Sequence, residues 1–312
     1  MRDGLVSASI ATAILAATPV LIAATGELLA EIVGVYNIGI EGAMLIGALG
    51  AFIGVQHTDT VLLGMLTGIV AGAAASFLFA LAVVVLKADV VVGGLALVFV
   101  ALGLTGLIGK DYVQQPAHAT IPKWDVPLLS DIPFWGEAFF QQLSVSYFAF
   151  LFPVAAVFLL YRTQHGLNMR SIGQDPGAAD ATGLTVTGWR IFYVSVGGAF
   201  AGLAGAVLTL GIVGTWLPNV TSGEGWIALA VVIFASWRPI PLIAGALLFG
   251  GLGTFGNVAQ VEGWSITPEF FSALPYVGTL AMVYVLALLR IRRGRGAPWP
   301  AALGLPFFRG TD

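Results

Sequence analysis

Long uninterrupted apolar runs fill this sequence and constrain its fold more than any other feature. A helix needs roughly 20 apolar residues to cross the hydrocarbon core of a bilayer. The runs are continuous and rich in Leu, Ala and Val, whereas a barrel strand would alternate in polarity over about 10 residues. We therefore predict an all-α fold, a polytopic transmembrane helical bundle of about 8–10 spans. The runs fall near residues 5–25, 32–55, 61–86, 90–109, 145–161, 191–217, 226–237, 240–258 and 270–290, and the seventh is short.

Composition supports the same conclusion. Only 9% of the chain is charged and 58% is hydrophobic, whereas a typical soluble domain is about 25% charged. So few charges could not cover a soluble protein of 312 residues, which excludes an ordinary soluble enzyme, a disordered chain and a nucleic-acid binder. The absence of cysteine excludes disulfides and thiol chemistry. We predict one transmembrane domain over residues 1–312.

Basic residues in short loops mark the cytoplasmic side of a membrane protein. They gather in the loop 162–190 and in the tail 290–312, so we expect this loop, the tail and the C-terminus to be cytoplasmic. The segment 110–142 holds two lysines against four acidic residues, which suits an external loop. The side of the N-terminus stays open. It is external if residues 26–55 cross once, and cytoplasmic if they break and double back.

Motifs for covalent chemistry are incomplete. Gly109-Lys110 resembles the end of a phosphate-binding loop, but Leu104 stands where its first glycine is required and Asp111 where Ser or Thr should bind magnesium. The three histidines lie far apart along the chain, so we expect no metal site. We predict no catalytic residue and no cofactor in this chain, and therefore a non-enzymatic subunit.

Four polar side chains interrupt the second apolar region. An ionisable group costs roughly 2.5–3.5 kcal/mol at the middle of a bilayer, so it normally faces a cavity or a partner. The Asn-Ile-Gly and Glu-Gly steps predict a broken helix near residues 37–42, and transporters bind substrate at such breaks. Alternatively, the first two glutamates lie at the cytoplasmic interface and the third pairs structurally. The four residues are Glu27, Glu31, Asn37 and Glu41.

A short helix outside the membrane is predicted in the loop that follows residue 165. Asp175 suits an N-cap, Pro176 the first helical position and Gly183 the position after the C-terminus. A helix of about two turns is unstable alone, so we expect it to dock into a partner. The alternative is a helical connector without a partner.

A second polar interruption precedes the short seventh run. A Gly-rich segment leads into about 12 apolar residues, too few to cross the bilayer, so we expect a half-helix there. Trp226 lies at its start. Its indole could stack on a planar ligand or serve as an interfacial anchor.

Taken together, these stretches resemble the permease subunit of an ATP-binding cassette importer, in the group that serves simple sugars, branched-chain amino acids and nucleosides. The resemblance is closest to the nucleoside-type permeases and runs in order along nearly the whole chain. Two positions depart from the usual pattern, namely Gln174 and the pair Ala235-Ser236, where the family often has Glu and Gly. The matching stretches are Thr18-Pro19 with residues 31–44, the loop 166–183, and residues 223–230 continued through Trp237-Arg238-Pro239 to Phe249-Gly250.

The resemblance implies several partners. A second homologous permease would complete the pore, as a heterodimer. Cytoplasmic ATPases, which hold the ATP and magnesium, would grip the short helix. An extracytoplasmic binding protein would deliver the substrate. The permease itself would lie in the cytoplasmic membrane of a bacterium, in contact with membrane lipid. The implied ATPase-coupling residues are Arg170, Gly173, Asp175, Pro176, Ala178, Ala179 and Gly183.

The resemblance predicts a translocation pathway for purine or pyrimidine nucleosides, driven by partner ATPases through alternating access. An importer of a simple sugar, such as ribose or galactose, is the nearest alternative. A secondary transporter would require ionisable residues on several spans, whereas here they concentrate around residues 27–41. We expect the pathway residues to be Asn37, Glu41 and Trp226.

Overall fold

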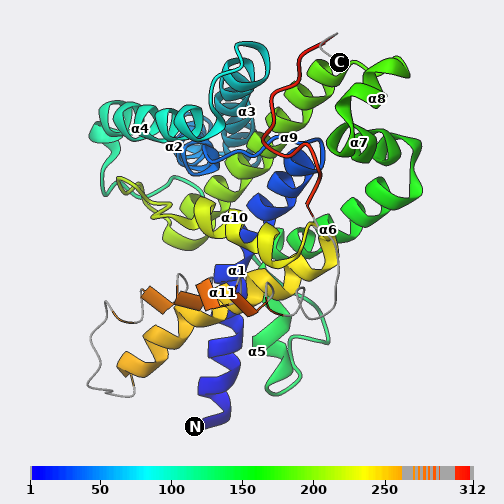
Figure 1. Cartoon of the computed structure of the whole chain (residues 1–312). Coiled ribbons are helices and arrows are strands. Elements are labelled where there is room, and N and C mark those ends of the chain that lie inside the picture. Colours follow the sequence, from blue (N-terminus) through cyan, green and yellow to red (C-terminus); the bar gives the residue numbers. More distant parts are fainter. Residues whose placement is uncertain are drawn as a thin grey trace.

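The computed structural model describes residues 2–261, individual positions between 270 and 288, and residues 299–309. The predicted span 270–290 lies largely outside the described residues. Helices dominate the described part of the chain, and Figure 1 shows them with the N-terminus and the C-terminus at opposite ends of the view. The α-helices are α1 (Arg2–Ile32), α2 (Ile40–Thr58), α3 (Val61–Ala80), α4 (Val90–Ile108), α5 (Trp135–Phe139), α6 (Ser144–Arg162), α7 (Gln164–Gln174), α8 (Pro176–Ala181), α9 (Val186–Val207), α10 (Glu224–Phe234) and α11 (Pro239–Val261).

Six of these helical segments are long and apolar enough to cross a membrane. Two of them extend through π-helical turns, η1 (Leu81–Val85) after α3 and η3 (Leu208–Val213) after α9, and a 3-10 turn, η2 (Gly109–Tyr112), follows α4. The helices α10 and Pro239–Phe255 are shorter apolar segments. This confirms the predicted all-α polytopic membrane bundle.

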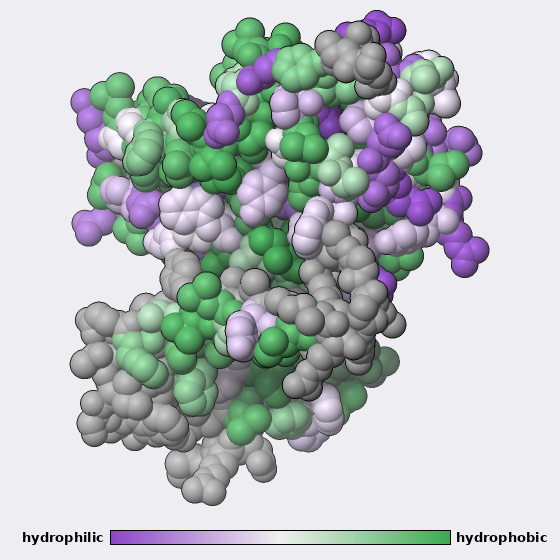
Figure 2. Space-filling model, in the orientation of Figure 1, coloured by the Kyte–Doolittle hydropathy of each residue, from purple (hydrophilic) through white to green (hydrophobic). Residues whose placement is uncertain are grey.

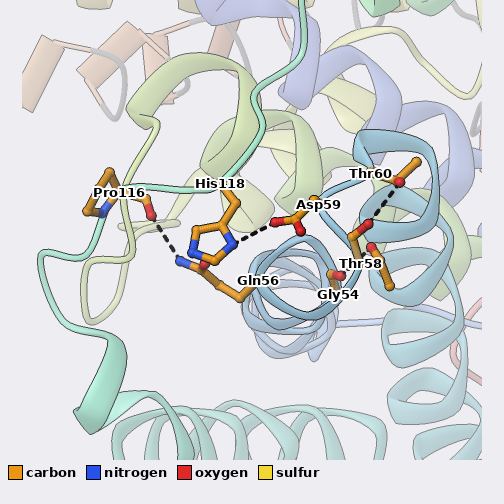
Figure 3. Close-up of polar contacts among 7 residues, drawn as sticks. All are labelled: Gly54, Gln56, Thr58, Asp59, Thr60, Pro116 and His118. Carbon is orange, nitrogen blue, oxygen red and sulfur yellow. Dashed lines mark hydrogen bonds and ion pairs between the residues drawn. The ribbon is translucent and has the colours of Figure 1, made fainter.

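A small antiparallel sheet lies in the segment that was expected to be an external loop. Its strands are β1 (Lys123–Asp125) and β2 (Gln141–Leu143), and Lys123 pairs with Leu143. The same segment is fixed to the end of α2, as Figure 3 shows: Gln56 donates to the Pro116 carbonyl at 2.9 Å, and His118 lies 2.8 Å from Asp59. The segment is therefore an ordered cover on one end of the bundle.

The predicted helix break lies between α1 and α2, but it begins earlier than the expected range 37–42. Helix α1 ends at Ile32, and α2 starts at Ile40. Gly34 adopts φ +92°, its N–H donates to the Glu31 carbonyl at 2.9 Å, and the next N–H donates to the Ala30 carbonyl at 3.1 Å. This is a Schellman motif, which ends a helix through a glycine in the left-handed conformation. Gly34 thus stops α1 before the Asn-Ile-Gly step is reached.

The helices α2, α3 and α9 meet through glycines. A Cβ on Gly202 would lie 2.2 Å from the Gly68 carbonyl oxygen, and one on Gly72 would lie 2.4 Å from the Gly198 carbonyl oxygen. Small residues four apart allow such close backbone approach between membrane helices. The centre of the molecule is therefore a tightly packed core of three helices.

Contacts of α1 define the two ends of the bundle. Ser7 donates to Glu137 of the 110–142 segment at 2.5 Å. The other end of α1 reaches α7, where the Ile32 carbonyl packs against Gly173. The N-terminus therefore lies at the 110–142 end, and α2 returns to that end, as expected if residues 26–55 cross once. Figure 2 shows hydrophilic residues gathered over α7 and α8 on the right and apolar residues over α3 and α4 on the upper left.

Candidate functional site

Glu41 closes the N-terminus of α10. Its side chain is 4% exposed and lies in the first turn of α2. One carboxylate oxygen accepts hydrogen bonds from the Thr221 hydroxyl at 2.5 Å and from the Gly223 N–H at 2.9 Å. The other oxygen accepts from the Gly225 N–H at 2.8 Å. A carboxylate satisfies the free N–H groups of a helix start and interacts favourably with the helix dipole.

This geometry makes α10 a half-helix, as predicted. Its 11 residues span only about 16 Å. It also supports the alternative that Glu41 pairs structurally, because both of its oxygens are occupied by protein donors. The partner of Glu41 lies 180 residues away at Thr221, and no local sequence pattern indicates this pairing.

Asn37 lies in the break and is fully buried. Its backbone N–H donates to Glu27 Oε1 at 2.8 Å, and its side-chain amide donates to the Ser76 hydroxyl of α3 at 3.3 Å. The amide oxygen has no partner in the described part of the chain. Asn37 therefore joins the break to α1 and α3.

Glu27 and Glu31 lie one turn apart near the end of α1, and both are fully buried. Trp237, in the turn between α10 and α11, donates its indole N–H to Glu31. One oxygen of each carboxyl group has no partner within the described residues. The two glutamates are thus enclosed by protein, near the end of α1 that contacts α7.

Trp226 is the accessible member of this group. Its side chain is 42% exposed, and its indole N–H donates to the Ile38 carbonyl at 3.3 Å. The structure therefore brings Asn37, Glu41 and Trp226 together where the α1–α2 break meets α10. Of the three, Trp226 alone offers a large exposed surface.

The predicted short helix forms as α8. The Asp175 carboxylate accepts the Ala178 N–H at 2.9 Å, Pro176 is the first helical residue and Gly183 adopts φ +90°. Ala178 is exposed, whereas Ala179 is 3% exposed and packs into the core. Only one side of α8 is therefore available to a partner.

The other expected coupling residues lie on α7. The Arg170 guanidinium lies 5.2 Å from the centre of the Tyr161 ring, a cation–π contact. Gly173 is buried, and a Cβ there would lie 2.0 Å from the Ile32 carbonyl oxygen. Helix α7 is thus in direct contact with the end of α1, just before the break.

Residues 299–309, called the C-terminal strap below, join these parts. The Ala302 N–H donates to the Gly173 carbonyl at 2.9 Å, and the Gly304 N–H donates to the Gly34 carbonyl at 3.0 Å. Arg309 forms a 3.2 Å ion pair with Asp180 of α8. Sequence reasoning treated this region only as a basic tail and missed these contacts.

Comparison with known proteins gives a consistent picture. Residues 9–284 match the family described as the permease component of the branched-chain amino acid transport system. TsgC13 of Haloferax volcanii, named as a provisional glucose ABC transporter permease, is 36% identical over 95% of this chain and 96% of its own length. No solved structure matches the chain significantly.

Two further relatives carry nucleoside names. The nucleoside ABC transporter permease NupC of Lactococcus lactis is 34% identical over 89% of this chain and 91% of its own length. The guanosine ABC transporter permease NupQ of Bacillus subtilis is 34% identical over 94% of each chain.

Proposed function

The chain belongs to the family of permease components of the branched-chain amino acid transport system, and from this membership we propose that it forms the translocation pathway of an ATP-binding cassette importer for nucleosides. Two similar permeases named for nucleosides or guanosine support this substrate. The relative named for glucose supports a simple sugar as the second candidate.

The substrate class is inferred from the N-terminus of α10, where Glu41 already occupies the free N–H groups. In many transporters the free N-terminus of a half-helix binds an anionic group of the substrate. Here Glu41 already accepts the Thr221 hydroxyl and two backbone N–H groups. Its negative charge would also repel a carboxylate. This favours an uncharged substrate, such as a nucleoside or a sugar, over an amino acid.

Trp226 is the proposed contact with that substrate, and Asn37 and Glu41 are proposed to position it. An exposed indole offers a flat face on which a nucleobase or the apolar face of a sugar can stack. Its hydrogen bond to Ile38 fixes the ring on the break, while Glu41 fixes the helix that carries it.

Coupling is proposed through α7 and α8, with ATP and magnesium held by a partner ATPase. The coupling residues are Arg170, Gly173, Asp175, Pro176, Ala178, Ala179 and Gly183. A movement of α8 would be transmitted through α7 to the α1–α2 break, because α7 contacts the end of α1 and the strap is hydrogen-bonded to both Gly173 and Gly34. In this scheme the chain performs no covalent chemistry itself.

The orientation and the other partners follow the same proposal. The α7–α8 end and the C-terminus face the cytoplasm of a bacterial cell, and the 110–142 end faces outward toward a substrate-binding protein. A second, homologous permease completes the pathway as a heterodimer.

The test is uptake of radiolabelled guanosine, uridine, glucose and leucine in cells that carry or lack the gene, each with the others as unlabelled competitors. Loss of nucleoside uptake that sugars do not compete for supports the proposal. Loss of glucose uptake alone would support the same type of importer, with a simple sugar instead of a nucleoside as its substrate. Loss of leucine uptake alone would contradict the argument from the closed start of α10.

A further inference from the structure

A cavity of about 530 Å³ lies at the α7–α8 end of the molecule. Four parts of the chain line it: the α1–α2 break, the turn between α3 and α4, Arg190 of α9, and the C-terminal strap. Its lining includes two basic side chains, Arg190 and Lys87, and one acidic side chain, Asp89. Trp226, the residue proposed to contact transported substrate, is not part of its lining.

Arg190 is only 3% exposed, yet its hydrogen bonds are incomplete. Its Nε donates to the Val33 carbonyl at 3.1 Å and its Nη1 to the Leu305 carbonyl at 2.9 Å. Its Nη2 is buried without a partner in the described part of the chain. Such an atom is costly in a folded protein unless a ligand or water satisfies it.

Gly34 keeps the space beside that nitrogen open. A Cβ at this position would lie 2.8 Å from Arg190 Nη2. The glycine that ends α1 therefore also leaves room for the Arg190 guanidinium in the wall of the cavity.

Lys87 supplies a second positive charge. Its Nζ donates to the Val84 carbonyl at 2.7 Å and to the Phe307 carbonyl at 2.5 Å, which leaves one of its three protons. Burial lowers the pKa of Lys87, and the nearby Arg190 charge lowers it further. Two like charges held close together favour an anion between them.

The acidic residue of the lining does not neutralise these cations. Asp89 Oδ1 accepts the N–H groups of Val91 and Val92, both at 2.9 Å, and so caps the start of α4. Within the described residues neither Lys87 nor Arg190 forms an ion pair with a carboxylate.

Apolar side chains surround the same region of the surface. Leu305 lines the cavity, Leu86 and Val92 directly adjoin lining residues along the chain, and all three are exposed. Cations beside exposed aliphatic side chains match an amphipathic anion with a charged head and apolar tails.

We propose that this cavity binds a phosphate group between Arg190 and Lys87, supplied by an anionic phospholipid headgroup or by a soluble phosphate. A guanidinium and an ammonium are the usual protein ligands of phosphate. Basic pockets between membrane helices recognise lipid headgroups in this way. The phosphate would complete the hydrogen bonding of Arg190 Nη2 and separate the two positive charges.

The experiment uses the purified full-length chain in detergent. Native mass spectrometry measures the dissociation constant of the first bound phosphatidylglycerol, with zwitterionic phosphatidylcholine as the comparison lipid. Inorganic phosphate is tested separately by its effect on the unfolding temperature. The variant is Lys87→Gln, and the matched control is Lys110→Gln, which removes an exposed positive charge at the opposite end. Lys87→Arg retains the charge.

A headgroup site predicts about fivefold weaker phosphatidylglycerol binding in Lys87→Gln, near-normal binding in Lys87→Arg and no change in Lys110→Gln. A soluble source predicts instead that phosphate raises the unfolding temperature of the unmodified chain but not of Lys87→Gln. The proposal is overturned if phosphatidylcholine binds as tightly as phosphatidylglycerol and phosphate has no effect. It is also overturned if Lys87→Gln and Lys110→Gln behave alike, or if neither phosphatidylglycerol nor phosphate binds.

Discussion

At the scale of single residues, Glu41 shows how a residue can matter for transport without touching substrate. Glu41→Gln replaces one acceptor oxygen with an amide NH2 that faces N–H or hydroxyl donors of the 221–225 segment. Leaving a buried donor unsatisfied costs about 1–3 kcal/mol. We expect this variant to lower both the unfolding temperature in detergent and uptake. Asp131→Asn, at an exposed position, is the control. Lost uptake with an unchanged unfolding temperature would instead make Glu41 a direct ligand.

Trp226 allows the opposite test. Its side chain is 42% exposed, so Trp226→Ala should lower the unfolding temperature less than truncation of a fully buried tryptophan such as Trp216 would. Loss of a stacking partner costs about 1–3 kcal/mol for a nucleobase, which predicts roughly 5- to 150-fold weaker transport at limiting substrate. Trp226→Phe retains an aromatic face but loses the hydrogen bond to Ile38. Uptake should therefore recover in part. Equal uptake by all three proteins would show that Trp226 is an anchor only.

For these residues, the local sequence pattern predicts that a constraint exists but not which distant residue satisfies it. A polar residue inside an apolar run signals a constraint, so Asn37 and Glu41 were recognisable. Their partners were not, because Thr221 lies 180 residues from Glu41 and Ser76 lies 39 residues from Asn37. Nothing in the local pattern distinguishes a carboxylate that binds substrate from one that caps a distant helix.

At the scale of elements, α8 was predictable because its signals are local. Asp175, Pro176 and Gly183 fix its two ends within nine residues. The side of α8 that faces outward depends on packing against α9 and could not be inferred from the caps. The break between α1 and α2 begins earlier than predicted because Gly34, with φ +92°, ends α1 before the Asn-Ile-Gly step.

Helix α8 offers a paired test of coupling. Ala178 is exposed and Ala179 is buried, although the two are neighbours. Ala178→Asp should preserve the unfolding temperature and reduce uptake by weakening contact with the ATPase. Ala179→Asp should lower the unfolding temperature, since it buries an unpaired carboxylate. If Ala178→Asp transports normally, its side of α8 is not a docking surface.

The glycine core formed by α2, α3 and α9 gives a second prediction at this scale. A Cβ at Gly202 would lie 2.2 Å from the Gly68 carbonyl oxygen, so Gly202→Ala forces the helices apart. Overpacking of this kind costs about 1–3 kcal/mol. At Gly103 of α4, a Cβ would meet no heavy atom within 4 Å, and Gly103→Ala should change stability by less than about 0.5 kcal/mol. Thermal unfolding in detergent compares the two, and equal effects would contradict close packing at Gly202.

At the scale of the whole molecule, the C-terminal strap connects parts that are distant in sequence. It contacts Gly173 of α7, Gly34 of the break, Arg190 of α9 and Lys87 of the α3–α4 turn. Most of these bonds involve backbone groups, which any sequence can supply. For this reason the composition of the tail indicated its side of the membrane but not its path.

Truncation after residue 298 tests whether the strap is structural. Among the described residues, it removes four hydrogen bonds to the rest of the chain, from or to Ala302, Gly304, Leu305 and Phe307, and the exposed ion pair between Arg309 and Asp180. At about 1 kcal/mol each, and discounted for partial exposure, their loss should cost about 2–4 kcal/mol and lower the unfolding temperature by roughly 5 °C. Truncation after residue 309 retains every one of these contacts and is the control. Because the strap also forms a wall of the cavity at Arg190, the shorter chain should lose selective binding of phosphatidylglycerol together with stability. If it instead unfolds at the same temperature as the control, the strap does not hold the α7–α8 end together, and α8 and the break move independently.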